Sequence, residues 1–542
     1  MSAPQIQNDI KLDTIEHAEQ PALATQASPI PHAVATVSPL QSYGLVKTIT
    51  SFKYATALCL LAGFNACSDG FQNGIPGNII AMEGFINQFG VDVDGVKTLE
   101  ASTISNWAAA YTAGYIVILL AGNWPIDYFG RQFCLLWVQL LMVVACLQQM
   151  FAKNWQLWLA SKLFDGLSVG LNQAVCSSYV SELAPTNARG ALLACYQLWW
   201  AVGGFGASIG IQIVSTMPSS QWRHAIYSEW VFIGIALIIW VFLPESPRWY
   251  CQKGKHEQAK KILQRVNGGV EGYDLETEYA ILVQEVEDGR RLAVRSSGTS
   301  FFDLFRGTNL RRTLISFGPF GWQQWIGVPV IFGYTSYFFQ LAGLKEVFMG
   351  TVAVNLILVV FVAISFFTVE KVGRRRLLLI GGVLMIVCLL IVGGMGTIKT
   401  QTSATGGVII AFSCVWVAVY ALTAGPIGYV YLAETSTVVL RAKTTSTAAA
   451  MTGMLNLVVN YCTPLMLSTT GANWGVKGTS FFYAGTGFIG LVLVYFFIPE
   501  TRGRSFIELD ELFERRIPAR DFPATRTTAE ETAAVAYKGE EV

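Results

Sequence analysis

Twelve apolar runs of about 20 residues, almost free of charge, constrain this chain more than any other feature. An α-helix of that length crosses a hydrocarbon core of about 30 Å, because it rises about 1.5 Å per residue. Charged residues make up only 13% of the chain, whereas soluble domains carry roughly 25%. We therefore predict an all-α, multi-pass membrane protein that lies in the lipid bilayer.

The apolar runs form two sets of six, separated by a charged segment. The first set covers 54–80, 103–125, 133–151, 155–181, 190–215 and 224–243, and the second covers 313–342, 347–369, 376–398, 407–434, 444–468 and 479–498. In the segment between them, apolar positions recur at helical spacing, which predicts short amphipathic helices at the membrane surface. The expected organisation is a disordered cytosolic tail (1–50), an N-terminal six-helix half (51–243), a cytosolic helical linker (244–312), a C-terminal six-helix half (313–498) and a cytosolic tail (499–542).

Basic residues are more frequent in the loops that lie inside if both termini are cytosolic, most clearly once the linker is counted. The positive-inside rule therefore predicts that both termini are cytosolic.

Three motifs occur twice, at corresponding places in the two halves. GNWPIDYFGRQ (122–132) matches FTVEKVGRRR (367–376), SELAPTNARG (181–190) matches AETSTVVLRAK (433–443), and PESPRW (244–249) matches PETRGR (499–504). Matched motifs in two six-helix halves are typical of transporters built from parallel repeats.

The charged residues of these motifs predict a cytoplasmic gate. Carboxylates and guanidiniums at helix ends are costly to desolvate alone but can pair across helices, bidentately in the case of arginine. Such pairs would hold the halves together when the protein opens outward; the alternative is ordinary topology-setting charge. The expected pairs are Asp127 with Arg131, Glu182 with Arg189, Glu245 with Arg248, Glu370 with Arg374 and Arg375, Glu434 with Arg441, and Glu500 with Arg502 and Arg504.

Together, SELAPTNARG, PESPRW and PETRGR resemble the sugar porter branch of the major facilitator superfamily, across about 54–520. YTSYFFQLAG (334–343) and the segment from NYCTPLML to ELDELFERRIPARDF resemble the fungal α-glucoside, or maltose permease-like, group in particular. The resemblance implies the major facilitator fold, with twelve transmembrane helices in two six-helix halves. It also implies transport of a mono- or disaccharide or polyol by alternating access, usually in the plasma membrane.

Polar side chains within the spans are candidates for binding the substrate, because a hydroxylated ligand needs hydrogen-bonding partners inside a bilayer. The resemblance implies roles for Gln197, for the pair Gln323 and Gln324, and for Tyr334, Tyr429 and Asn456. Each could instead join helices to one another. Two departures from the family pattern indicate a larger or less hydroxylated ligand: Pro329 replaces an expected asparagine, and Gly453 replaces a tryptophan common in hexose carriers.

The resemblance also bears on proton coupling. Gln72 occupies the position of the aspartate that titrates in proton-driven relatives, and Lys162 replaces its arginine partner, which favours facilitated diffusion over proton symport. Asp69 lies one helical turn away, and a carboxylate inside the membrane is a functional candidate by default. Asp69 could pair with Lys162 and restore coupling, Asp165 could be the partner or titrate instead, or Asp69 could be purely structural.

Other classes of function fit less well. A transporter or exporter of a non-sugar metabolite remains an alternative because of Pro329, Gln72 and Gly453. A non-transporting sugar sensor would need a long signalling tail, and only 36 residues follow Phe506. The net charge of +1 argues against nucleic-acid binding. No cofactor, metal or catalytic site is expected, because the four histidines lie in tails or loops. The expected partners are the substrate, the bilayer and, for symport, protons.

Overall fold

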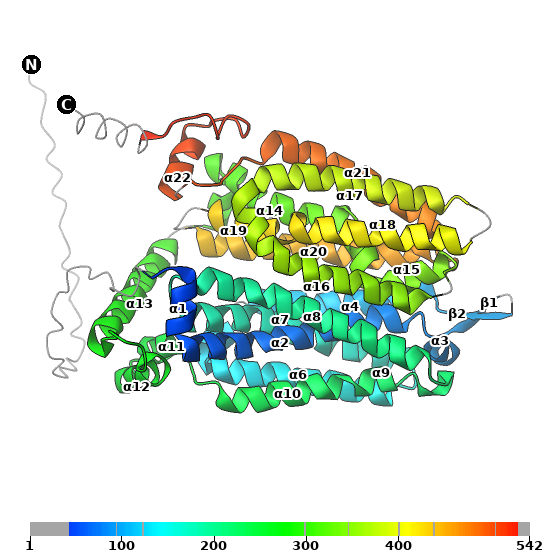
Figure 1. Cartoon of the computed structure of the whole chain (residues 1–542), viewed down its shortest axis with the longest axis horizontal. Coiled ribbons are helices and arrows are strands. Elements are labelled where there is room, and N and C mark those ends of the chain that lie inside the picture. Colours follow the sequence, from blue (N-terminus) through cyan, green and yellow to red (C-terminus); the bar gives the residue numbers. More distant parts are fainter. Residues whose placement is uncertain are drawn as a thin grey trace, which may run out of the picture. The chain divides into compact units, whose positions relative to one another are not determined.

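The computed structural model describes residues 43–528, apart from 94, 122–123, 298–299, 345, 399–401, 437–439 and 505. Each of the twelve predicted apolar runs is occupied by a helix or a broken helix (Figure 1). The N-terminal half consists of α2 (Lys53–Ile79), α4 (Ala101–Ala121), α6 (Arg131–Phe151), α7 (Trp155–Leu183), α8 (Arg189–Ser215) and α10 (Glu229–Phe242), the last preceded by the short α9 (His224–Tyr227).

Two of the six spans of the C-terminal half are interrupted. The half comprises α14 (Gly307–Trp325), η4 (Pro329–Gly333), α15 (Thr335–Leu341), α16 (Val347–Val372), α17 (Arg374–Met395), α18 (Ser403–Leu422), α19 (Ala424–Glu434), α20 (Arg441–Leu467) and α21 (Gly475–Phe497). The first break lies between Trp325 and Pro329, where Gly327 has a φ of 106°. The second lies at Thr423, whose φ and ψ of −126° and −89° are not helical. In both spans the helical hydrogen-bond pattern of the backbone is therefore interrupted inside the bundle.

Nine helices in the described chain are long and apolar enough to cross a membrane, or ten if the bent pair α1 (Leu45–Ser51) and α2 is one span. Two further predicted spans do not meet that test. α7 carries Lys162 and Asp165 in its interior, and α14 is separated from α15 by the break at Gly327. Composition alone therefore undercounts the spans that carry polar side chains or breaks.

The halves pack against each other mainly through two helix pairs, α4 with α20 and α8 with α16, and also where α2 meets η4 and α15. Within the N-terminal half, glycines allow helices to touch backbone to backbone. A Cβ at Gly203 on α8 would lie 1.9 Å from the carbonyl oxygen of Cys67 on α2, and one at Gly166 on α7 would lie 1.9 Å from that of Tyr111 on α4. Any larger residue at these two positions would separate the helices.

The remaining elements lie between or beyond the spans. They are α3 (Glu83–Phe89), the antiparallel strands β1 (Val91–Val93) and β2 (Val96–Thr98), α5 (Trp124–Phe129), η2 (Ser219–Gln221), the linker elements α11 (Pro247–Gln252), α12 (His256–Asn267), α13 (Leu275–Ser297) and η3 (Phe301–Phe305), and α22 (Phe506–Glu514). The linker is helical as predicted, although α13 is longer than the short helices expected.

Both predicted tails contain ordered structure. α1 begins at Leu45, so the last residues of the segment predicted to be disordered form a helix; residues 1–42 lie outside the described part. At the other end, α22 packs on the start of α14, where Arg312 Nη1 lies 2.5 Å from Asp510 Oδ1. Phe513 and Phe522 are buried beside Arg311, which lies over both rings. Burial of these aromatic rings fixes the segment after α21, which the sequence pattern alone did not predict.

Candidate functional site

A buried polar cluster joins three helices of the N-terminal half. Asp165 on α7 accepts hydrogen bonds from Gln72 of α2 and from Gln149 of α6, the latter at 2.9 Å. Lys162, one turn before Asp165 on α7, forms an ion pair with it at 2.7 Å. All four side chains are buried. The cluster therefore balances its one carboxylate with one ammonium and two amides, as a charge inside a membrane requires.

Asp69 lies apart from this pair. It is fully buried on α2, and its Oδ2 accepts a hydrogen bond of 2.9 Å from the hydroxyl of Tyr196 on α8. Its Oδ1 has no hydrogen-bond partner among the described residues, and the amide of Asn172 donates to the carbonyl of Asn65. The pairing of Asp69 with Lys162 considered above is not observed here, since Lys162 binds Asp165.

Glu229 is a buried carboxylate that the sequence analysis did not single out. It begins α10 and is 2% exposed, and neither of its oxygens has a hydrogen-bond partner among the described residues. Lys162, Asp165 and the thiol of Cys146 lie close enough to act on it electrostatically. Its position within the predicted run 224–243 was a usable signal, because a carboxylate inside a span is a functional candidate by default.

In the C-terminal half, Gln323 and Gln324 have different surroundings. Gln323 is buried, and its amide donates to the carbonyl oxygen of Ala424 at 2.5 Å while its Oε1 accepts from the hydroxyl of Tyr420 at 3.2 Å. These bonds join α14 to both sides of the break between α18 and α19. Gln324 is only half-buried. In this conformation, Gln323 acts as a brace between helices.

Tyr334 and Asn456 meet around Asn460 of α20. The Tyr334 hydroxyl donates to the carbonyl oxygen of Asn460 at 3.3 Å, and the amide of Asn460 donates to the side chain of Asn456. Tyr334 directly follows η4, which packs against α2 of the other half. This group therefore lies close to where the halves meet.

The other predicted substrate positions are less informative. Gln197 is half-buried on α8, and the side chain of Tyr429 lies outside the described residues. Pro329 begins the π-helical turn η4. Gly453 lies close to α4, because a Cβ there would be 2.9 Å from Ile116.

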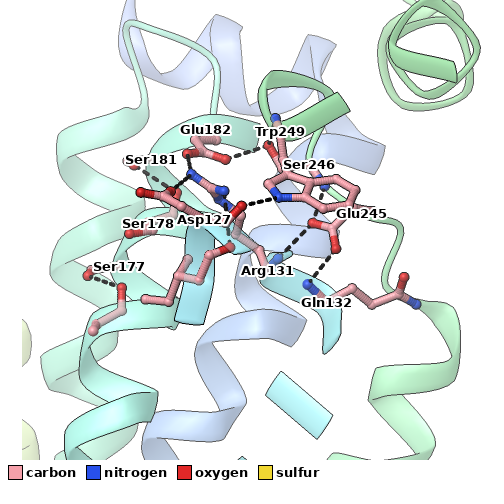
Figure 2. A network of polar contacts seen from close by, with 12 residues as sticks. Asp127, Arg131, Gln132, Ser177, Ser178, Ser181, Glu182, Glu245, Ser246 and Trp249 are labelled. Atoms are coloured by element: carbon pink, nitrogen blue, oxygen red, sulfur yellow. Dashed lines mark hydrogen bonds and ion pairs between the residues drawn. The ribbon is translucent and has the colours of Figure 1, made fainter. Parts of the chain in front are cut away.

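Each half carries its repeated motifs at the same end of the bundle, called here the motif end. Figure 2 shows the charged network at this end in the N-terminal half. The guanidinium of Arg131 lies 2.9 Å from Glu182 and 3.2 Å from Asp127. Glu245 accepts hydrogen bonds from the backbone N–H groups of Arg131 at 2.9 Å and Gln132 at 3.1 Å. Burial raises the pKa of Glu245, against the lowering effect of these N–H groups and of Ser246.

The C-terminal half repeats the contacts of Glu245 and of the Arg131–Glu182 pair. Glu500 accepts from the backbone N–H groups of Arg374 at 2.9 Å and Arg375 at 3.1 Å, and Arg374 lies 3.2 Å from Glu434. The Thr501 hydroxyl donates to Glu434, as the Ser246 hydroxyl donates to Glu182.

The turn before each arginine requires glycine for two reasons. Gly130 and Gly373 have φ angles of 100° and 101°, a region that side-chain-bearing residues avoid. A Cβ at these glycines would also lie 2.3 Å from Glu245 Oε2 and 2.8 Å from Glu500 Oε2. The two turns are therefore built to bring a carboxylate onto the first N–H groups of α6 and α17.

The predicted pairings within each motif need correction. Asp127 pairs with Arg131 as expected, but Glu182 pairs with Arg131 rather than Arg189, and Glu434 pairs with Arg374. Among the described residues, Glu245 binds backbone N–H groups and not the guanidinium of Arg248. Glu500 likewise binds backbone N–H groups, including that of Arg502 at 3.2 Å, and not the guanidiniums of Arg502 or Arg504. Arg504 donates to the carbonyl oxygens of Phe522 and Thr525. The side chains of Glu370 and Arg441 lie outside the described residues.

In the part of the chain that the structure describes, these ion pairs lie within a half and not between halves. At the opposite end the halves touch directly. The hydroxyl of Ser105 donates to the carbonyl oxygen of Tyr461 at 2.7 Å, and the N–H of Ala101 donates to Thr470 at 2.9 Å. The N–H of Ser336 donates to the side chain of Asn78 at 3.2 Å. The halves are therefore joined at the end opposite the motifs.

Along the described chain, no group of three or more His, Cys, Asp or Glu side chains could hold a metal ion.

The chain is similar to known proteins along most of its length. The family model "Sugar (and other) transporter" matches residues 58–513. "MFS transporter fmqE" of Aspergillus fumigatus is 28% identical, over 87% of this chain and 88% of its own length. The galactose transporter of Saccharomyces cerevisiae is 27% identical, over 87% and 83%, and the general alpha-glucoside permease of that yeast is 25% identical, over 90% and 79%.

Among solved structures, the inward-open conformation of the xylose transporter XylE from E. coli has the same fold. It superposes with a TM-score of 0.71 at 22% identity, covering 85% of this chain and 100% of that one.

Proposed function

This chain belongs to the family of sugar (and other) transporters, and we propose that it moves a sugar or polyol across a membrane by alternating access, as a facilitator. It is a transporter and not an enzyme, as are the relatives named above. The observation that carries the proposal is the way the halves meet. They touch at one end, whereas the ion pairs found among the described residues of the motif end lie within each half. Two units joined in this way can rock about α4–α20 and α8–α16 and expose a central site alternately.

Amide and hydroxyl groups on both sides of this interface support a hydroxylated substrate. Gln197 on α8 and Gln324 on α14 are half-buried, as is Asn456 on α20. Groups that face water in one state and substrate in another need such intermediate exposure. The names of the galactose and alpha-glucoside relatives also support a sugar.

Facilitated diffusion is supported by the cluster around Asp165. Gln72 cannot titrate, and Asp165 is already balanced by Lys162 at 2.7 Å. An Asp165 carboxylate held by Lys162 and two amides has no need to bind a proton when the substrate is carried.

Proton symport is the second candidate, and Asp69 favours it. This carboxylate is fully buried, faces no described cation and keeps one oxygen without a partner. The structural relative XylE is named a proton:xylose symporter. Under this candidate Asp69, with Tyr196 as its hydrogen-bond donor, would carry the proton.

The proposed location is the plasma membrane, with the motif end and both termini in the cytosol. The basic residues of the motifs support that orientation. A transporter of a non-sugar metabolite remains the alternative substrate class, because the name of the fmqE relative specifies no sugar.

The test is uptake of labelled glucose, galactose and maltose by cells that lack their own sugar carriers, at acidic and neutral external pH, with and without a protonophore. A facilitator should take up sugar regardless of both, and Asp69→Asn should leave that independence unchanged. Symport would be established if the protonophore stops uptake by the unaltered protein. This sensitivity to the protonophore should then be lost in Asp69→Asn and kept in the matched Asn65→Ala variant of the same helix. Surface-localised protein that takes up none of these sugars would overturn the sugar assignment.

A further inference from the structure

The linker contains a cavity that lies apart from the polar clusters described above. It has a volume of about 490 Å³ and lies between the end of α11, the start of α12 and the second half of α13. Three arginines of α13 line it, Arg290, Arg291 and Arg295, together with His256 of α12. Of the described residues that line it, Glu287 alone is a carboxylate. We propose that this cavity binds a phosphate-bearing anion.

The floor of the cavity is apolar and firmly packed. Val286 is 6% exposed and, with Cys251 and Ala259, forms a small separate core that holds α11, α12 and α13 together. Side chains on such a floor are placed by packed helices rather than by a mobile loop. The volume lies within the range of about 300–1,000 Å³ found for small-molecule sites.

The arginines have donors to spare. Arg290 uses one N–H on the carbonyl oxygen of Gln252, at 2.8 Å, which fixes its guanidinium at the cavity. Among the described residues, Arg291 forms two exposed ion pairs, at 3.3 Å to Glu287 and 3.9 Å to Asp288. Exposed pairs of this kind are weak and exchange readily. A guanidinium carries five N–H donors in a planar fork that fits two phosphate oxygens at once, so these side chains favour phosphate over a single-point anion.

The position of the cavity connects it to both halves. α11 and α12 pack against α7 and α2 of the N-terminal half. Ser296, which follows Arg295, accepts a hydrogen bond of 2.7 Å from Lys443 at the start of α20 in the C-terminal half. An anion held by the arginines and His256 would therefore fix the end of α13 one residue from its contact with the other half.

The experiment is isothermal titration of the purified full-length protein with inorganic pyrophosphate. We expect saturable binding that weakens by about tenfold or more when the lining arginines are changed together, as Arg290→Gln, Arg291→Gln and Arg295→Gln. The matched control removes the same charge from exposed arginines elsewhere, as Arg306→Gln, Arg516→Gln and Arg526→Gln, and should bind like the unaltered protein.

A second arm uses vesicles of phosphatidylcholine with and without phosphatidylinositol bisphosphate. Arginine-dependent binding to pyrophosphate identifies a soluble ligand, and arginine-dependent binding only to the phosphoinositide vesicles identifies a lipid headgroup; both support the proposal. Equal weakening by the two triple variants, or no saturable binding in either arm, would overturn it. Because binding is measured without transport, its failure is distinct from failure of the proposed function.

Discussion

Gln323 and Gln324 are neighbours in the chain, yet the structure gives them different surroundings. The family resemblance assigned both to the substrate. In this conformation the Gln323 side chain bonds Tyr420 and Ala424, so it holds α14 against the broken span α18–α19. Sequence alone could not separate the two residues, because the difference depends on where the break at Thr423 falls.

We expect Gln323→Ala to lower stability and Gln324→Ala to lower substrate affinity. Loss of the Gln323 amide leaves the Tyr420 hydroxyl and the Ala424 carbonyl without this partner inside the bundle, at a cost of about 1–3 kcal/mol. Thermal unfolding of the purified variants and the KM for sugar uptake would separate these effects. Equal melting temperatures for the two variants would contradict the bracing role of Gln323.

Gly77 lies where backbones of the two halves approach closely. A Cβ at this position on α2 would lie 1.7 Å from the carbonyl oxygen of Gly333 in η4. Overpacking of this kind costs about 1–3 kcal/mol. We expect the cost to fall on the conformation in which α2 and η4 touch, as they do here. We therefore expect Gly77→Ala to lower uptake by about tenfold at equal surface expression.

The control for that variant is Gly210→Ala on α8, where the nearest atom to a Cβ is Ser228 Oγ at 3.7 Å. Alanine is the better helix former by about 1 kcal/mol, so this change should leave uptake and stability intact or slightly raise stability. Full uptake by Gly77→Ala would show that the two backbones need not touch during transport.

At the scale of elements, the sequence predicted helix positions well and their internal breaks poorly. An apolar run reports directly which segment lies in lipid, so the predicted runs coincide with helices to within a few residues. The run 313–342 nevertheless contains the break before Pro329, and 407–434 contains the one at Thr423. Hydropathy does not register such breaks, because the broken segments stay apolar.

The repeated motifs were also only half predictable. Their residues were identified from the duplication, but the partners were not, because pairing depends on how three helix ends are arranged in space. Glu182 and Arg131 are far apart in sequence and yet lie 2.9 Å apart. The duplication does predict that matched residues make the same contacts in both halves. Glu245 and Glu500 confirm this, because each accepts a backbone N–H of the matched arginine.

The two motif networks differ in burial, which predicts unequal effects of matched substitutions. The side chains of Arg131 and Glu182 are 5% and 8% exposed, against 13% and 24% for Arg374 and Glu434. Removing one partner of a buried pair costs about 3–5 kcal/mol, whereas a more exposed pair contributes about 1 kcal/mol or less. Arg131→Gln should therefore lower the apparent unfolding temperature more than Arg374→Gln. If the two variants melt together, burial does not govern the strength of these networks.

At the scale of the whole molecule, the two ends of the bundle are unlike. Contacts between the halves at the end opposite the motifs include Asn78 with Ser336, Ala101 with Thr470 and Ser105 with Tyr461. The sequence indicated two equivalent halves, and the family match confirms the fold, but no sequence pattern states which end is closed. Which end is closed depends on the small free-energy difference between two conformations of the same chain.

Alternating access requires this end to open, and a covalent link across it tests the requirement. Ala101→Cys with Thr470→Cys places thiols where an N–H and a hydroxyl now meet at 2.9 Å. We expect oxidation to abolish uptake and reductant to restore it. The control, Val91→Cys with Thr98→Cys, links opposed strand residues within the N-terminal half at the same end, so it should leave uptake unchanged. If the oxidised Ala101–Thr470 pair still transports at full rate, substrate crosses without separation of the halves at this end.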